Sequence, residues 1–317
     1  MRVTPVIEAD GLGKRYGAVV ALEGLTLAVQ PGEILGVLGP NGAGKTTAIR
    51  ILTTIVSPDR GRFSVAGVPH TRPAEIRRRV GVVPESAGYP GRQTGEEFLR
   101  FHARLFGHTR AGAHAAARAL LAQVGLAERG GSLIAGYSRG MRQRLGIARA
   151  LVNDPRVVFL DEPTLGLDPA GQRQMLALVR SITAERGATV LLCTHLLAEV
   201  EEVCSRVLIL NRGRVAAEGT VSEVARRAAA PRSARLRVPA EHVDRARRAL
   251  AAASGIERVE PAKGQPGSLT ATLNGDASVV AMNGGLRALA EANIPVISFE
   301  LEGARLSDAF LAMTSES

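Results

Sequence analysis

The feature that most constrains this chain is an eight-residue loop of the form G-x-x-x-x-G-K-T at residues 39–46. The apolar run 34–38 precedes it and predicts a buried strand, and the residues after the loop predict a helix. A glycine-rich turn alone is ambiguous, but a strand before and a helix after are the context in which this pattern cradles phosphates. The loop consists of Gly39, Pro40, Asn41, Gly42, Ala43, Gly44, Lys45 and Thr46, and Thr47 follows it.

The chemistry of this loop indicates a nucleoside triphosphate as the ligand. Glycines let backbone N–H groups approach phosphates more closely than side chains allow, and the start of a helix adds partial positive charge. Lys45 is expected to reach the β- and γ-phosphates as a point charge. The Thr46 hydroxyl is expected to complete one corner of a Mg²⁺ shell.

Length and composition favour two globular domains. The chain has 317 residues, of which 45% are hydrophobic and 22% charged, and this length exceeds that of a usual single domain. Aromatic residues make up only 3%, with no Trp, so little base-stacking machinery for nucleic acid is available. The net charge of +10 rests mainly on arginine. A GC-rich genome favours such a composition, and an anionic lipid or nucleic-acid surface stays an alternative.

The cysteines and the hydropathy pattern bear on the compartment. Cys193 and Cys204 are too few and too close in sequence for a disulfide framework or a metal site, and we expect reduced, buried thiols. No stretch approaches the ~20 apolar residues that cross a bilayer, and the N-terminus has no apolar signal core. The expectation is a cytosolic chain that crosses no membrane itself.

A second motif is a pair of acidic residues at the end of a predicted strand. Residues 157–160 are all apolar, as in a strand buried on both faces of a parallel sheet, and Asp161 and Glu162 follow directly. A carboxylate at such a strand end is expected to lie beside the phosphate loop. We assign Asp161 to Mg²⁺, and Glu162 to orienting or deprotonating the attacking water. The alternative is an acidic pair that caps the next helix.

A third motif lies between the other two. Ser138 is well placed as the N-cap of a helix whose Leu145, Ala148 and Leu151 form an apolar face. The order of phosphate loop, Ser-x-Gly helix start and Leu-Asp-Glu-Pro strand end resembles the ATP-binding subunit of ATP-binding-cassette (ABC) transporters, over roughly residues 5–220. The resemblance implies an α/β P-loop NTPase cassette, with a mixed sheet core and a helical subdomain at about residues 86–150.

The resemblance also implies roles for single residues. Tyr16 matches the aromatic residue that stacks on adenine, and His195 matches the switch histidine near the γ-phosphate. Without the family, both would be interpreted as structural residues. The family forms a symmetric homodimer in which each subunit completes the other's ATP site. The positions that match contacts to the partner's nucleotide are Ser138, Arg139, Gly140 and Asp168.

This chain departs from the family pattern in three places. Glu85 stands where a Gln is usual; its carboxylate can still ligate Mg²⁺ but adds a charge near the triphosphate. Arg139 and Met141 replace a Gly and a Gln of the signature loop, as in a subgroup of bacterial exporters. Residues 86–136 match no family motif tightly.

The poorly matching region still contains a clear helix signal. Residues 94–97 fit a capping box, and Phe98, Phe101 and Leu105 then fall on one face of the helix that follows. We assign this Phe stripe to the core. The alternative is a docking face, because in the family this subdomain receives a membrane partner, and both assignments can hold for different residues of the stripe.

The C-terminal part predicts a second, small α+β domain. Residues 1–225 form the cassette, 226–232 the linker and 233–317 the accessory domain in this prediction. Strands at 236–238, 256–260, 268–274 and 296–301, with helices at 240–253 and 277–292 and a turn at 264–267, suggest a ferredoxin-like β-α-β-β-α-β unit. Its ending resembles the tail of daunorubicin-type exporter ATPases, and its role is open between dimerisation, stabilisation and substrate sensing.

The resemblance therefore implies a Mg²⁺-dependent ATPase that powers a separately encoded membrane permease for export of a drug or other small molecule. We expect a homodimer held by ATP, peripheral to the cytoplasmic face of a bacterial membrane, with no nucleic-acid partner. The alternative is a cassette ATPase that acts on DNA or ribosomes. Such proteins typically carry long coiled-coil insertions or two fused cassettes, and this chain has one cassette and no sustained heptad repeat.

Overall fold

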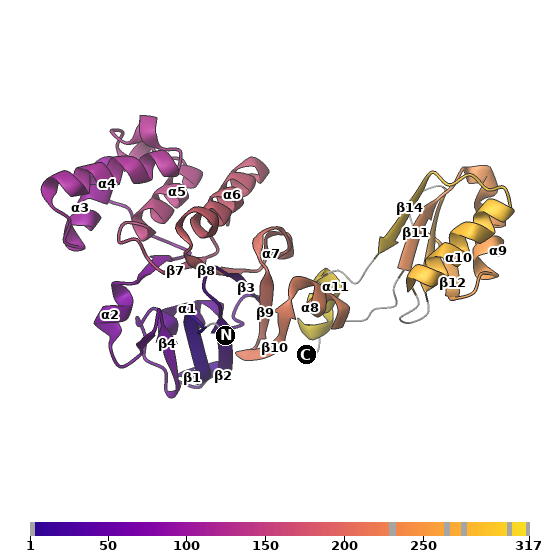
Figure 1. Cartoon of the computed structure of the whole chain (residues 1–317), viewed down its shortest axis with the longest axis horizontal. Helices are drawn as coiled ribbons and strands as arrows, with labels where there is room; N and C mark the ends of the chain where they lie inside the picture. Colours follow the sequence, from indigo (N-terminus) through magenta and orange to yellow (C-terminus); the bar gives the residue numbers. More distant parts are fainter. Residues whose placement is uncertain (1–3, 228–232, 263–266, 274–277, 303–305, 315–317) are drawn as a thin grey trace. The chain divides into compact units, whose positions relative to one another are not determined.

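The computed structural model of the chain describes residues 4–227, 233–262, 267–273, 278–302 and 306–314 (Figure 1). Its residue contacts divide the chain into two compact units, Met1–Val221 and Ser222–Ser317. Residues 228–232 of the predicted linker, 264–266 of the predicted turn, and the predicted strand and helix ends at 274 and 277 lie outside the described residues.

The central sheet of the first unit has the strand order β10-β9-β3-β8-β7-β6. Strands β9, β3, β8, β7 and β6 run parallel, and β10 pairs antiparallel with β9. Every residue of β3, β7 and β8 is buried, and for β3 and β7 the apolar runs at 34–38 and 157–160 predicted this. The six strands are β3 (Ile34–Leu38), β6 (Val80–Val83), β7 (Val157–Asp161), β8 (Thr189–Thr194), β9 (Arg206–Asn211) and β10 (Arg214–Thr220).

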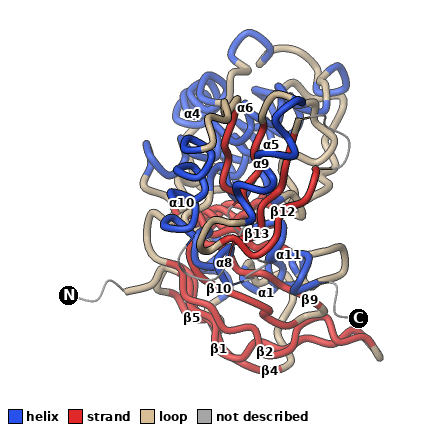
Figure 2. Tube along the Cα trace, turned by 90° about the vertical axis from the view of Figure 1, so that its right-hand side faces the viewer, coloured by secondary structure: helices blue, strands red, loops and turns tan. Residues whose placement is uncertain are grey.

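A second sheet of this unit is antiparallel, with the order β2-β1-β4-β5. Figure 2 shows its strands running alongside one another at the bottom of the view. The strands are β1 (Ile7–Tyr16), β2 (Val19–Val29), β4 (Arg60–Val65) and β5 (Val68–Pro69). The two faces of the central sheet enter two different cores: Phe159 packs in the core shared with the antiparallel sheet, and its neighbours Val158 and Leu160 in the core shared with the helices. The loop at residues 39–46 therefore follows a strand of a sheet that is packed on both faces.

The helices of the first unit gather mainly at the end away from the antiparallel sheet (Figure 1). They are α1 (Lys45–Leu52), α2 (Pro73–Arg77), α3 (Gly95–Leu105), α4 (Arg110–Gln123), α5 (Arg139–Ala150), α6 (Pro169–Arg186) and α7 (Leu197–Val203), with 3₁₀ turns at Ala127–Arg129 and Ile134–Gly136. The mixed sheet with its helical part confirms the predicted α/β cassette.

Helix α3 begins as predicted but packs differently. Thr94 and Glu97 form the reciprocal capping box. Phe98 is 5% exposed and belongs to the core, but Phe101 is 54% and Leu105 67% exposed. The assignment of the whole Phe stripe to the core was therefore wrong. Periodicity identifies a shared face of a helix, and it does not say how far neighbouring elements cover that face.

The second unit has a sheet of order β12-β13-β11-β14 with antiparallel pairing throughout. Helices α9 and α10 supply Ala246, Leu250 and Leu289 to a core with Leu236 and Leu269 of the strands. This order and the β-α-β-β-α-β sequence are those of the predicted ferredoxin-like unit. Its elements are β11 (Ser233–Arg237), a 3₁₀ turn (Ala240–His242), α9 (Val243–Ala251), β12 (Ile256–Pro261), β13 (Ser268–Leu273), α10 (Ser278–Glu291), β14 (Ser298–Glu302) and α11 (Leu306–Thr314).

Helix α8 (Val221–Arg227) differs from the prediction at its end. Arg226 and Arg227, which we expected in the linker, form its last residues. Arginine is a good helix former, so the helix that starts at Val221 continues through both. Within the described part of the chain, no helix is both long and apolar enough to cross a membrane.

Candidate functional site

The phosphate-binding loop joins the end of β3 to the start of α1. Gly44 caps α1 with a φ of 108°, a conformation that favours glycine, and no side chain caps the helix. A Cβ on Gly39 would lie 2.5 Å from the Leu210 carbonyl oxygen, and one on Gly44 would lie 2.5 Å from that of Ala21. Glycine is therefore required at both ends of the loop, where it brings the backbone of neighbouring strands close.

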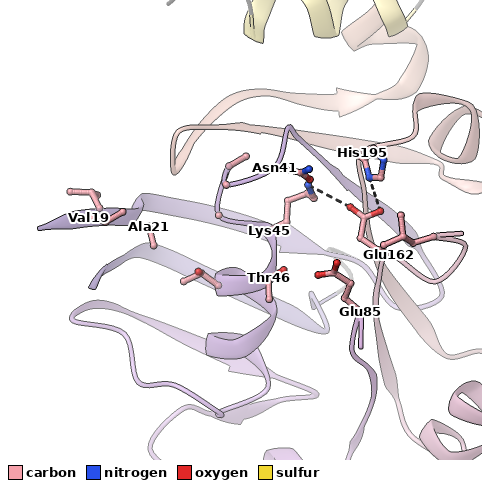
Figure 3. A pocket seen from close by; sticks show the side chains of 14 residues that line it. Val19, Ala21, Asn41, Lys45, Thr46, Glu85, Glu162 and His195 are labelled. Carbon is pink, nitrogen blue, oxygen red and sulfur yellow. Dashed lines mark hydrogen bonds and ion pairs between the residues drawn. The ribbon is translucent and has the colours of Figure 1, made fainter. Parts of the chain in front are cut away.

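Lys45 folds back over this loop. Its Nζ donates hydrogen bonds to the carbonyl oxygens of Gly39 (2.6 Å) and Pro40 (3.2 Å). The same Nζ lies 3.6 Å from Oε1 of Glu162, and the residue is only 6% exposed (Figure 3). A buried ammonium is held by such partners because its charge is costly without them. The loop and the acidic motif of β7 are thus joined by one cation.

Glu162 connects Lys45 to His195. Strands β7 and β8 are parallel neighbours with Asp161 opposite Cys193, so the residues that follow both strands meet at one edge of the sheet. The Glu162 N–H donates to the Cys193 carbonyl oxygen at 2.9 Å, and Oε2 of Glu162 lies 2.9 Å from Nδ1 of His195. Glu162 has a φ of 50°, a left-handed backbone that is uncommon for glutamate. The buried Glu162 carboxylate is thus contacted by Lys45 on one oxygen and by His195 on the other.

Asp161 is the most deeply buried acid of the site, at 3% exposure. Its Oδ1 has no hydrogen-bond partner among the described residues. Burial raises the pKa of Asp161, the charges of Glu85 and Glu162 raise it further, and the Thr46 hydroxyl and Lys45 partly offset this. An unpaired buried oxygen surrounded by like charges is a position that a cation would relieve.

The oxygen ligands at this point fit Mg²⁺. The Thr46 hydroxyl and the Asp161 and Glu85 carboxylates are hard donors, and Mg²⁺ is usually held by one or two carboxylates together with water and substrate phosphates. No group of three or more His, Cys, Asp or Glu residues with metal-binding geometry occurs in the described ranges. A site that borrows phosphate oxygens does not need such a group.

Lys45, Thr46, Glu85, Glu162 and His195 line a pocket of about 560 Å³ (Figure 3), and Asp161 is not among its lining residues. Its predicted lining residues are Asn41, Gly42, Ala43, Gly44, Lys45, Thr46, Thr47, Glu85, Glu162 and His195. Tyr16 does not line it; the ring is 43% exposed, and Lys14 Nζ lies 5.8 Å from its centroid. Val19, Val20, Ala21 and Leu165 also line the pocket and were not predicted from the sequence. The sequence signal for Val19 and Val20 was that they form an apolar pair just after the turn that follows Tyr16.

The other four predicted nucleotide contacts lie in a different pocket, of about 360 Å³. Ser138 caps α5 by accepting from the Met141 N–H at 3.2 Å, and Asp168 caps α6 by accepting from the Gly171 N–H at 3.2 Å. The Arg139 guanidinium covers Gly166 so closely that a Cβ there would lie 2.6 Å from its Cζ. The pocket is lined by Ser138, Arg139, Gly140, Arg144, Gly166, Leu167, Asp168, Ala170, Gly171, Gln174 and Met175. None of these residues lines the first pocket.

Relatives of the chain agree with this architecture. Residues 22–165 match the ABC transporter family model. The chain is 38% identical over 316 residues to the daunorubicin/doxorubicin resistance ATP-binding protein DrrA of Streptomyces peucetius, covering 98% of this chain and 93% of that one. It is 44% identical over 220 residues to the Nod factor export ATP-binding protein I of Burkholderia pseudomallei, covering 69% and 72%.

Solved structures show the same relationship for the cassette. An ATP-binding subunit of an ABC transporter matches with a TM-score of 0.63 and 35% identity, covering 70% of this chain and 92% of that one. The cbiO1 protein of Clostridium perfringens, part of the ABC transporter complex cbiONQ, matches with a TM-score of 0.64 and 27% identity, covering 70% and 90%. The chain therefore belongs to the ATP-binding proteins of the ABC transporter family.

Proposed function

We propose that this chain hydrolyses ATP and so powers export of a drug or other small molecule by a separately encoded membrane permease. The observation that carries the proposal is the continuous contact of Lys45, Glu162 and His195 at the end of the phosphate-binding loop. It joins a phosphate-binding cation, a carboxylate and an imidazole in one pocket. The names of the two relatives, which refer to drug resistance and Nod factor export, support export as the coupled process.

Each side chain has a task in this proposal. Lys45 turns from its carbonyl partners to the β- and γ-phosphates, and the first-turn N–H groups of α1 bind the same anion. Glu162 orients and deprotonates the attacking water, while His195 holds that carboxylate in place. Thr46, Asp161 and Glu85 hold Mg²⁺, which supplies charge neutralisation at the phosphates.

The proposed functional form is a homodimer. The first pocket carries the phosphate-binding and carboxylate groups, and the second carries Ser138, Arg139 and the exposed Asp168. Neither pocket has both sets. Two copies arranged head to tail bring the second pocket of one copy over the first pocket of the other, which makes ATP the link between subunits.

The permease is proposed to dock on the helical part of the cassette. Phe101 and Leu105 are one helical turn apart on α3, and both are largely exposed. Exposed apolar groups side by side favour a protein partner over solvent. In this proposal the chain is peripheral to the cytoplasmic face of the membrane, where the basic charge of the chain suits anionic headgroups.

The experiment that tests this function is affinity purification of tagged Glu162→Gln protein from gently solubilised membranes with Mg·ATP, followed by mass spectrometry. We expect an ATP-stabilised dimer with a stoichiometric polytopic membrane protein. The matched control is Glu162→Gln combined with Lys45→Ala, which removes the phosphate contact and should abolish the ATP-dependent dimer. Recovery of ribosomes or DNA in place of a membrane protein would contradict the transport role.

A further inference from the structure

A buried acid behind the site is used by none of the roles above. Glu199 lies in the first turn of α7 and is 4% exposed. The fully buried Thr164 hydroxyl donates a hydrogen bond to its Oε1, and its Oε2 has no hydrogen-bond partner among the described residues. Burial raises the pKa of Glu199, the Thr164 and Thr194 hydroxyls partly offset this, and the charge of Glu162 raises the pKa further.

The partners of Glu199 belong to two segments that the proposed function uses. The α7 segment begins just after His195, where the Leu196 N–H donates to the Thr194 hydroxyl oxygen at 3.0 Å and Glu199 N–H donates to the Leu196 carbonyl oxygen at 3.2 Å. The Thr164 segment begins just after Glu162 and leads to the exposed Asp168. Glu199 thus fixes the position of the His195 segment relative to the root of the Asp168 loop.

Burying a carboxyl group at this position costs desolvation free energy. Two apolar side chains of similar size would pack there without desolvating a charge, and replacing buried polar pairs in that way is often neutral or stabilising. The orphaned Oε2 adds to the cost. Buried acids with perturbed pKa values cluster at functional sites. The hydrogen-bonded pair of Thr164 and Glu199 therefore indicates a role beyond packing.

We propose that Glu199 is a positioning residue that, through the Thr164 hydroxyl, couples the His195 segment to the 164–168 loop and so links the state of one nucleotide pocket to the surface offered to the second copy. This inference rests on the proposed function. In the middle of the loop, Arg139 covers Gly166, so the loop contacts Glu199 at its buried root and the start of α5 at its exposed part.

The test compares full-length Glu199→Ala and Thr164→Val with Thr164→Ser, which restores a hydroxyl. Glu201→Ala is the matched control, because Glu201 is exposed on the same helix. ATP turnover is measured at micromolar protein with lipid and any membrane protein that co-purifies. We expect turnover to fall at least about ten-fold in the first two variants, with KM for ATP within about two-fold of wild type. Thr164→Ser and Glu201→Ala should keep wild-type turnover.

Two further readouts separate coupling from simple support of the fold. In a Glu162→Gln background, Glu199→Ala and Thr164→Val should weaken ATP-dependent dimerisation, measured by light scattering, while the Kd for ATP stays within two-fold. The variant that combines Glu199→Ala with Thr164→Val should dimerise no more weakly than the more affected single variant, because both substitutions remove the same hydrogen bond. The proposal would be overturned if Glu199→Ala and Thr164→Val both kept wild-type dimerisation and turnover. It would also be overturned if Thr164→Ser lost as much activity as Thr164→Val, because the hydroxyl group would then make no difference. A wild-type chain without ATP turnover would instead reject the proposed function.

Discussion

The two pockets of the cassette are built in opposite ways. The first is lined by a lysine, two glutamates and a histidine, with Asp161 behind them; Lys45, Glu162 and Asp161 are buried, whereas Glu85 is exposed. The second is lined by exposed Ser138, Arg139 and Asp168; the Ser138 hydroxyl caps α5 and the Asp168 carboxylate caps α6. This difference fits the proposal that the first pocket carries out chemistry at a fixed place and that the second pocket is presented to another copy of the chain.

The largest expected effect comes from the first pocket. Lys45→Ala should lower kcat/KM for ATP at least about 100-fold, because it removes the one buried cation between the phosphate loop and Glu162. Steady-state ATP hydrolysis measures this. Arg50→Ala is the control, since Arg50 is an exposed basic residue on the same helix. A Lys45 variant with more than a tenth of wild-type activity would mean that the first pocket does not hold the reacting phosphate.

Mixing two inactive chains tests whether the pockets work in different copies. One chain carries Lys45→Ala and the other Ser138→Arg, and each should be inactive as a homodimer. In the mixed dimer, one composite site retains both native halves, so we expect roughly a quarter of wild-type activity at equal mixing. The control is a chain with both substitutions mixed equally with wild type: its mixed dimers have no native composite site, and the wild-type homodimers alone should also leave roughly a quarter of wild-type activity. If each chain completed its own site, the first mixture would be inactive and the control would keep about half of wild-type activity.

A smaller effect is expected when the cap of α5 is removed. Ser138→Ala should destabilise the protein by about 1 kcal/mol, because a helix N–H loses its partner, and should also lower turnover. Thr109→Ala removes the equivalent cap of α4, where Thr109 accepts from the Gly112 N–H at 3.0 Å, away from both pockets. Urea unfolding should show similar losses for the two variants, and only the Ser138 variant should lose activity. Equal activity losses would reduce the second pocket to a structural feature.

The smallest expected effect concerns the stability that the protein loses by burying the ionised Asp161 carboxylate in the first site. Because burial raises the pKa of Asp161, the folded state binds its proton more tightly than the unfolded state. Stability contributed by the protonated acid is therefore lost as pH rises from the unfolded pKa through the raised folded pKa. Asp161→Asn should be more stable than wild type by about 1 kcal/mol at neutral pH, with the difference shrinking in acid. Unfolding of nucleotide-free protein at several pH values checks this; a less stable Asn variant at neutral pH would contradict it.

The sequence predicted the elements whose pattern is local. Strands β3 and β7 and the α5 start follow from apolar runs and a capping residue, and the split βαβ order of the second unit follows from alternating periods. The phosphate-loop residues form their pocket because contiguous residues share one turn. The catalytic and binding roles of all these residues stay predictions.

Contacts between distant segments could not be predicted in this way. Thr164 and Glu199 are 35 positions apart, and neither a periodic pattern nor a spacing rule relates them before β7 and β8 are known to be neighbours. The exposure of Phe101 depends on how α4 and α5 cover α3, which the α3 sequence does not contain. The Arg139 contact with Gly166 likewise requires the arrangement of α5 and α6.

The left-handed backbone of Glu162 restricts which mutations evolution can try there. Single-nucleotide changes of a glutamate codon reach aspartate, glutamine, lysine, glycine, alanine and valine. Only glycine and, to a lesser degree, aspartate favour a φ near 50°, and valine disfavours it strongly. Under the proposed role of Glu162, relatives that lose hydrolysis through a change at this position are expected to carry glycine or aspartate there, and such substitutions would mark subunits that bind ATP but turn it over slowly or not at all.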